Sequence, residues 1–244
     1  MKYTLNEYIS KIKSLPIKNK YTKEEILTQD FLIDKDNRLE IYYAPHNEYI
    51  NPKAKIFIIG ITPGFQQMST AMATAREGIE NGKSIEDIKY DCKVAGRFSG
   101  ILRKNIISML DEINLNKSLN INSCDELFKE KDYLLHTTSL IPYSVFSKGN
   151  NYTGHSPKLM KSEFLMKYVY ENLIENIEKL GDVLIIPLGK AVEEVLDYFV
   201  NKNIIEKDQI LRGFPHPSGA NAHRLTQLRD NKENMIKIIE SYIK

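Results

Sequence analysis

The stretch KIFIIGI, residues 55–61, is a nearly continuous apolar run that ends with a glycine and one further apolar residue. A strand that is apolar at every position, rather than at every second one, is typical of the centre of a parallel sheet covered on both faces. Three more short apolar runs follow, and segments with helical periodicity lie between or beside them, at 100–113, 162–180 and 190–202. Alternating strands and helices predict an α/β fold, a three-layer α/β/α sandwich around a central, mainly parallel four-stranded sheet.

The N-terminal part of the chain has its own signals. Two capping-box patterns, at Thr4–Glu7 and Thr22–Glu25, each predict the start of a helix. The alternating segment RLEIYY, 38–43, predicts a strand. No linker rich in Pro, Gly or Ser divides the chain. We therefore expect one domain over 1–244, with 1–50 as a helical and extended addition packed on it.

Charge and cysteine content narrow the classes of function. With 34 Lys and Arg against 32 Asp and Glu, the net charge of +2 does not by itself point to a polyanionic partner. The two cysteines, Cys92 and Cys124, lack the CxxC spacing of zinc sites and are too few for an iron–sulfur cluster. The N-terminus lacks a signal-peptide pattern, and no apolar run is long enough to span a bilayer. We expect a cytoplasmic protein without metal, cofactor or membrane association.

In parallel sheets, ligands bind beyond the carboxyl ends of the strands. Four loop segments are predicted there: GITPG (60–64), HTTS (136–139), LGKA (188–191) and GFPHPSGAN (213–221). None contains GxxxxGK[ST] or GxGxxG, so sites for nucleoside triphosphates and dinucleotides lack their usual motifs. In the last segment, prolines on both sides of His216 stiffen the loop that carries the imidazole. Taken alone, this loop could also be a surface turn whose histidine has no function.

These segments also occur in a recognisable order. GITPGFQQ, the Gly-aromatic segment AGRFSG, the polar strand end HTTS and finally HPS resemble the ordered motifs of the uracil-DNA glycosylase superfamily. The resemblance covers roughly residues 55–243. It is nearest to the branches whose first motif reads GxNPG, the single-strand-selective and mismatch-specific enzymes. It implies a monofunctional glycosylase that flips an altered, uracil-type base out of DNA and excises it in base-excision repair.

Base excision passes through an oxocarbenium-like sugar while the base departs as an anion. By the resemblance, His216 donates to the departing base, and Thr62 stands where the superfamily has a water-positioning Asp or Asn. Phe98 matches the residue that stacks on the base, and Thr138 the residue that reads its edge. The full set of residues expected to contact substrate or DNA is Gly60, Ile61, Pro63, Gly64, Phe65, Phe98, Thr138, Ser139, Pro217, Ser218, Gly219, Asn221 and Arg224.

Several alternatives stay open. Thr62 carries no charge to favour the oxocarbenium ion, which is compatible with a weakened or inactive DNA-binding member of the superfamily. Phe98 fits a core position equally well, and the hydroxyls of 137–139 could satisfy backbone groups at a strand end. A third hypothesis is an α/β enzyme that acts on a small nucleoside or nucleotide. For the leading hypothesis the partner is single- or double-stranded DNA, bound by a monomer.

Overall fold

The computed structural model describes residues 2–243, which form two compact units, each assembled from three separate segments of the chain. Unit 1 consists of 2–50, 61–97 and 139–175, and unit 2 of 51–60, 98–138 and 176–243. The expectation of a single domain over the whole chain stays a prediction.

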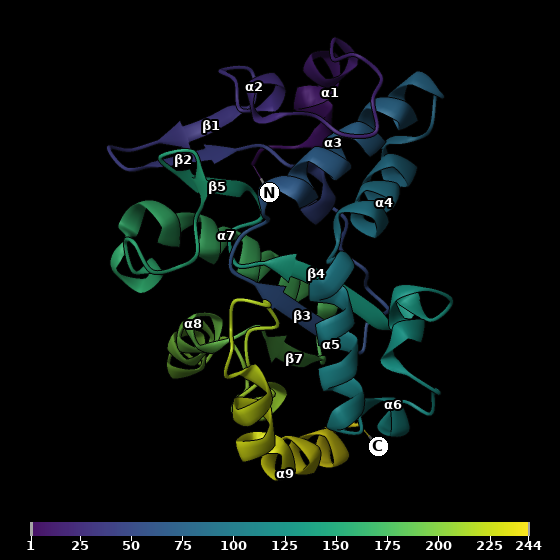
Figure 1. Ribbon diagram of the computed structural model, residues 1–244, viewed down its shortest axis with the longest axis vertical. Coiled ribbons are helices and arrows are strands. Elements are labelled where there is room, and N and C mark those ends of the chain that lie inside the picture. Colours follow the sequence, from purple (N-terminus) through teal and green to yellow (C-terminus); the bar gives the residue numbers. More distant parts are fainter. Residues whose placement is uncertain (1, 244) are drawn as a thin grey trace. The chain divides into compact units, whose positions relative to one another are not determined.

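Unit 2 is built around a sheet in which β3 (Ile56–Gly60) lies between β4 (Leu135–Ser139) and β7 (Leu184–Pro187), as Figure 1 shows. Every residue of β3 and β7 is buried, and the two strands run parallel with Ile56 opposite Leu184. The expected parallel sheet is confirmed. In place of the expected fourth strand, the sheet has a single parallel bridge between Ile185 of β7 and Ile210.

Helices cover this sheet, which confirms the mixed α/β class. On one face Ile56 and Ile58 of β3 share a core with the buried residues of α5 (Gly100–Glu112) and α9 (Arg224–Tyr242). On the other face the ring of Phe57 contacts His136, whose Nε2 lies 2.6 Å from Oδ1 of Asn176. There α8 (Lys190–Asn201) packs against β7. The shorter elements of unit 2 are α6 (Leu115–Ser118), η2 (Cys124–Phe128), η3 (Asp132–Leu134) and η5 (Lys207–Gln209).

Unit 1 contains a second sheet, which is antiparallel, with the order β1-β2-β5-β6. The predicted strand at 38–43 is confirmed as β2 (Leu39–Tyr42), but its neighbours were not expected from the sequence. They are β1 (Leu32–Lys35), β5 (Ser144–Ser147) and β6 (Asn150–Asn151). Lys148 and Gly149 connect β5 to β6 with positive φ angles of 49° and 73°, the signs that a two-residue type I′ hairpin requires.

The helices of unit 1 begin where the capping patterns place them. The glutamate of each capping pattern accepts from the backbone N–H of its threonine, Glu7 from Thr4 at 3.2 Å before α1 (Leu5–Lys13) and Glu25 from Thr22 at 2.9 Å before the one-turn α2 (Lys23–Ile26). The segment that follows GITPG forms α3 (Phe65–Glu80) and α4 (Ile85–Gly96). The remaining helical elements are η1 (Pro45–Asn47), η4 (Leu159–Lys161) and α7 (Glu163–Leu180), whose last turn belongs to unit 2.

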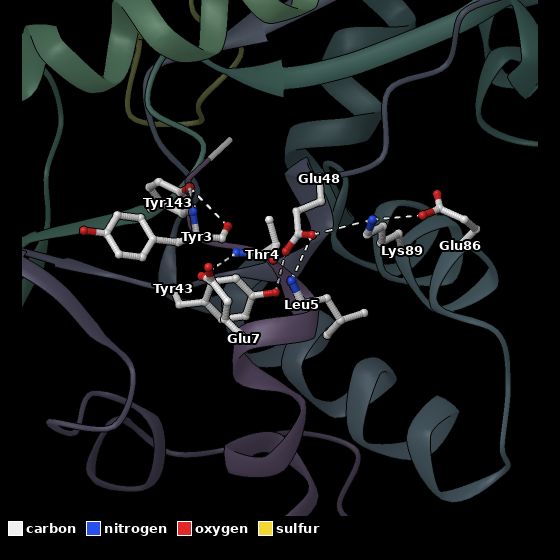
Figure 2. A network of polar contacts seen from close by, with 9 residues as sticks. All are labelled: Tyr3, Thr4, Leu5, Glu7, Tyr43, Glu48, Glu86, Lys89 and Tyr143. Atoms are coloured by element: carbon white, nitrogen blue, oxygen red, sulfur yellow. Dashed lines mark hydrogen bonds and ion pairs between the residues drawn. The ribbon is translucent and has the colours of Figure 1, made fainter.

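A buried carboxylate holds the start of α1 in place. Glu48 accepts hydrogen bonds from the Tyr43 hydroxyl at 2.5 Å and from the backbone N–H of Leu5 at 3.0 Å, as Figure 2 shows. Burial raises the pKa of Glu48, and the bonds from Tyr43 and Leu5 oppose that rise. In the same view the Tyr143 hydroxyl accepts a hydrogen bond from the backbone N–H of Tyr3 and donates one to the backbone carbonyl of Tyr3, each at 3.2 Å. The N-terminal segment is thus tied into unit 1 by polar contacts as well as by apolar packing.

Candidate functional site

The first predicted motif begins at the buried Gly60, the last residue of β3, and continues into unit 1. There the Thr62 hydroxyl donates to the carbonyl oxygen of Tyr143 at 2.7 Å and accepts from the backbone N–H of Val145 at 3.1 Å. A hydroxyl has one proton and two acceptor lone pairs, so one acceptor position is left for a further partner. Thr62 therefore connects this turn to the start of β5, a role that its neighbours in the sequence do not reveal.

The turn ends at the N-terminus of α3. The backbone N–H of Phe65 donates to Oδ1 of Asn151 at 3.0 Å, and that of Gly64 donates to Oε1 of Gln67 at 3.1 Å. The ring of Phe65 lies edge-on to Phe146, with ring centroids 6.4 Å apart. Asn151 comes from the β5–β6 hairpin and was not among the predicted site residues. Pro63 is buried, whereas Ile61, Gly64 and Phe65 are half-buried.

Beside this turn lies a group of buried polar side chains. The ammonium of Lys93 donates to Oδ1 of Asn47 at 2.9 Å, and Nδ2 of Asn47 donates to the carbonyl of Pro142 at 3.0 Å. Burial lowers the pKa of Lys93 well below its usual value, and the charge of Arg97 lowers it further. Gln67 joins the group to the turn, because its Nε2 donates to the carbonyl of Gly96 at 2.9 Å.

In unit 2 the predicted catalytic loop has a specific hydrogen-bond pattern. The imidazole of His216 is exposed, although the prolines on either side of it are buried. Its Nδ1 accepts from the backbone N–H of Ser218 at 3.2 Å, and its backbone carbonyl accepts from Nδ2 of Asn221 at 3.2 Å. A neutral imidazole that accepts at Nδ1 carries its proton on Nε2. This pattern assigns the Nε2–H tautomer to His216.

Two further residues support the loop from neighbouring elements. Asn105 in α5 donates from Nδ2 to the carbonyl of Pro217 at 2.8 Å. Gly189, between β7 and α8, has a φ of 90°, and a Cβ at this residue would lie 2.9 Å from Cβ of His216. Gly189 also donates its N–H to the carbonyl of Phe214 at 3.2 Å. LGKA was expected near the loop, whereas Asn105 gave no recognisable signal because it lies inside a regular helix.

The two residues matched to base recognition are both buried. Phe98 is 7% exposed and belongs to the core cluster shared with α5 and α9. Thr138 is 3% exposed, and its hydroxyl oxygen has no hydrogen-bond partner among the described residues. Ser139 follows it in unit 1, where its backbone carbonyl accepts from Nδ2 of Asn172 at 2.8 Å. Gly219 is exposed, and Arg224, the first residue of α9, is half-buried.

The predicted site residues fall into two groups. Ile61, Thr62, Pro63, Gly64, Phe65 and Ser139 lie in unit 1, and the others lie in unit 2. Within unit 2 the structure brings His216, Pro217, Ser218 and Asn221 together in one hydrogen-bonded loop. That both groups line a single base-sized pocket stays a prediction.

The described part of the chain contains neither a metal-ligand cluster nor a membrane-spanning helix. No group of three or more His, Cys, Asp or Glu side chains in residues 2–243 is arranged to hold a metal ion. None of the helices over the same residues has the length and apolar character needed to cross a membrane.

Comparisons with known proteins gave two matches, and no protein-family model matches the chain. The crystal structure of wild-type Pedobacter heparinus SMUG2 aligns with 99% of this chain and 98% of that one, with 15% identity and a TM-score of 0.43. The YoxB protein of Bacillus subtilis (strain 168) is 43% identical over 239 residues, which cover 98% of this chain and 93% of YoxB. The chain therefore belongs to the YoxB family.

Proposed function

We propose that the protein is a monomeric, cytoplasmic DNA glycosylase that hydrolyses the N-glycosidic bond of an altered, uracil-type base. The proposal combines the motif order of the sequence with one observation, the hydrogen bond from Ser218 N–H to Nδ1 of His216. That bond leaves the Nε2–H as the donor of a neutral imidazole.

A donor of this kind suits the chemistry of base excision. When the glycosidic bond breaks, negative charge develops on the departing base, and a fixed hydrogen-bond donor stabilises that charge. His216 is exposed in this structure and lies on a loop held at several backbone positions, so its imidazole is accessible to a flipped nucleotide.

The hydroxyl of Thr138 supports the same proposal. A buried polar group without a partner costs about 1–3 kcal/mol, so such groups are rare in native proteins. A base carbonyl or amino group would supply the missing hydrogen bond once binding of the flipped base has opened access to this buried oxygen. A single hydroxyl does not present the paired donor and acceptor of an asparagine amide. We therefore expect a site with Thr138 to bind a broader set of pyrimidines than uracil alone.

The proposed site lacks a charged group at Thr62 to position the attacking water molecule. Because the proton of Thr62 is donated to Tyr143, Thr62 has only an acceptor position to offer a water molecule. The loss of a well-placed charged group in catalysis costs on the order of a hundredfold or more in rate. The proposed enzyme is accordingly a slow glycosylase.

The test is single-turnover excision from oligonucleotides that carry deaminated, alkylated or oxidised bases, in single- and double-stranded form. On any base that the parent excises, His216→Ala should lower the rate roughly 100- to 1,000-fold, the effect of losing one donor to a developing anion. The melting temperature should change little because His216 is exposed. His223→Ala removes another exposed histidine nearby and serves as the control. An undiminished rate in folded His216→Ala would remove this residue from the catalytic list.

A second candidate function follows from the bonds of Thr62. A protein that keeps the DNA-binding loop but lacks a water-positioning group would bind altered DNA without cutting it. In that case the parent produces no abasic sites across the panel, and Thr62→Asn gains base excision. Equal excision by the parent and by Thr62→Asn would rule out the silent binder.

A further inference from the structure

The peptide unit that joins Pro217 to Ser218 is held from both ends. Its carbonyl oxygen accepts from Nδ2 of Asn105 at 2.8 Å, and its N–H donates to Nδ1 of His216 at 3.2 Å. Since a peptide unit is planar, a bond that fixes the direction of the carbonyl also fixes the direction of the N–H on the opposite side. The side chain of Asn105 is thereby coupled to the imidazole of His216 through one rigid plane.

The prolines of the loop cannot supply this control. A proline ring fixes φ of its own residue and leaves ψ free to vary. The orientation of the 217–218 peptide depends on ψ of Pro217, so rotation there would turn the Ser218 N–H away from the imidazole. The hydrogen bond from Asn105 restrains that torsion directly.

Asn105 is itself held on a rigid support. It lies in the middle of α5, where the next residue, Ile106, is fully buried, as are Met109 and Leu110 one turn further on. These side chains pack in the core cluster that contains Ile56 and Ile58 of the central strand. The core of unit 2, and not only the loop itself, therefore determines the orientation of the 217–218 peptide.

We propose that Asn105 is a positioning residue that selects the Nε2–H tautomer of His216 by orienting the 217–218 peptide. The catalytic consequence rests on the proposed glycosylase function, whereas the effect on the tautomer does not. Asn105 does not contact the reacting atoms in this scheme. It determines whether the imidazole presents a donor or an acceptor to the departing base.

The primary test is independent of catalysis. Nitrogen-15 chemical shifts of the His216 ring report its tautomer, and hydrogen exchange reports protection of the Ser218 amide. In Asn105→Ala, we expect a mixture of tautomers, and exchange of the Ser218 amide should be roughly two- to tenfold faster, the range for the net loss of one ordinary hydrogen bond. Asn105→Asp has the same shape but places an acceptor against the Pro217 carbonyl, and it should produce at least as large a change.

The matched control is Asn116→Ala, which removes an asparagine-to-carbonyl hydrogen bond of 3.0 Å to Asn122 elsewhere in unit 2. It should leave the His216 tautomer and the Ser218 exchange rate unchanged. If Asn105→Ala does not fold, Asn105→Asp provides the same readouts. A wild-type tautomer and wild-type exchange in a folded Asn105 variant would overturn the proposal.

Excision assays form a separate arm. On a base that the parent excises, Asn105→Ala should lower kcat roughly two- to tenfold with KM for the DNA nearly unchanged, because the residue acts on the donor and not on binding. If the parent excises no base, the glycosylase proposal fails, while the tautomer and exchange measurements still decide the role of Asn105.

Discussion

The buried imidazole of His46 in unit 1 has a strongly lowered pKa. It is 2% exposed, and its ring lies against Gly96, where a Cβ would come within 2.9 Å of Cβ and Cγ of His46. The Nδ1 atom is buried without a hydrogen-bond partner among the described residues. Burial, followed by the charge of Lys93, lowers the pKa of His46 to about 3. The imidazole is therefore neutral in the folded protein at any pH near neutrality.

This shift predicts a loss of stability in acid. Between the unfolded pKa near 6.5 and the folded pKa of about 3, the unfolded chain binds a proton at His46 that the folded protein does not. The contribution of His46 to stability is thus fully present above pH 6.5. It is lost as the pH falls toward 3, with a slope of up to about 1.4 kcal/mol per pH unit.

His46→Phe keeps an aromatic ring of similar size and should remove this part of the slope. The measurement is urea unfolding at a series of pH values from 7 to 4. His155→Phe, at an exposed position of the same unit, is the control and should keep the acid-side loss. A parallel loss of stability in His46→Phe would show that other groups carry the acid sensitivity.

The turn between β7 and α8 contacts the loop that carries His216. Gly189 adopts φ 90° and ψ 168°, a region that is essentially restricted to glycine. A Cβ added to Gly189 would lie 3.3 Å from the backbone nitrogen of His216. The same residue caps α8, since its carbonyl accepts from the N–H groups of Val192 and Glu193. One residue therefore caps the helix and contacts the loop that carries His216.

Gly189→Ala should destabilise the protein by about 1–3 kcal/mol through its backbone conformation, and by more where His216 cannot move aside. It should also lower excision beyond the effect on folding, because His216 is displaced. Chemical unfolding and single-turnover excision measure the two effects. For the stability measurement Gly219→Ala is the control, since an added Cβ there meets nothing within 4 Å. Equal stability of both variants would contradict the contact at Gly189.

The path of the chain makes each unit depend on distant segments. The central strand β3 belongs to 51–60, while β4, β7 and all helices of unit 2 come from 98–138 and 176–243. Since β4 and β7 each pair with β3, the sheet cannot form without it. Ile56 and Ile58 are fully buried in the same core.

A fragment of residues 98–244 should consequently fail to fold although it contains most of unit 2. We expect no cooperative thermal transition by circular dichroism and poor dispersion of amide resonances, in contrast to the full chain. A cooperative transition in the fragment would show that β4 and β7 form a stable sheet without β3.

Local chemistry made several features predictable. The apolar runs at 55–61 and 182–189 are long enough for buried strands and too short for helices, and they form β3 and β7. The Thr4–Glu7 pattern marks the start of α1 because the Glu7 side chain accepts from the Thr4 N–H within one helical turn. The prolines around His216 likewise indicated a stiff loop, since their effect on φ is confined to their own residues.

The antiparallel sheet of unit 1 and the roles of single polar groups were decided by contacts between distant residues. Thr62 bonds to Tyr143 and Val145, which are 81 and 83 residues away, and Asn105 reaches Pro217 across 112 residues. A hydroxyl or a side-chain amide is compatible with many partners, so its neighbours in the chain do not select one. Only the packing of the elements that carry these groups brings a particular donor to a particular carbonyl.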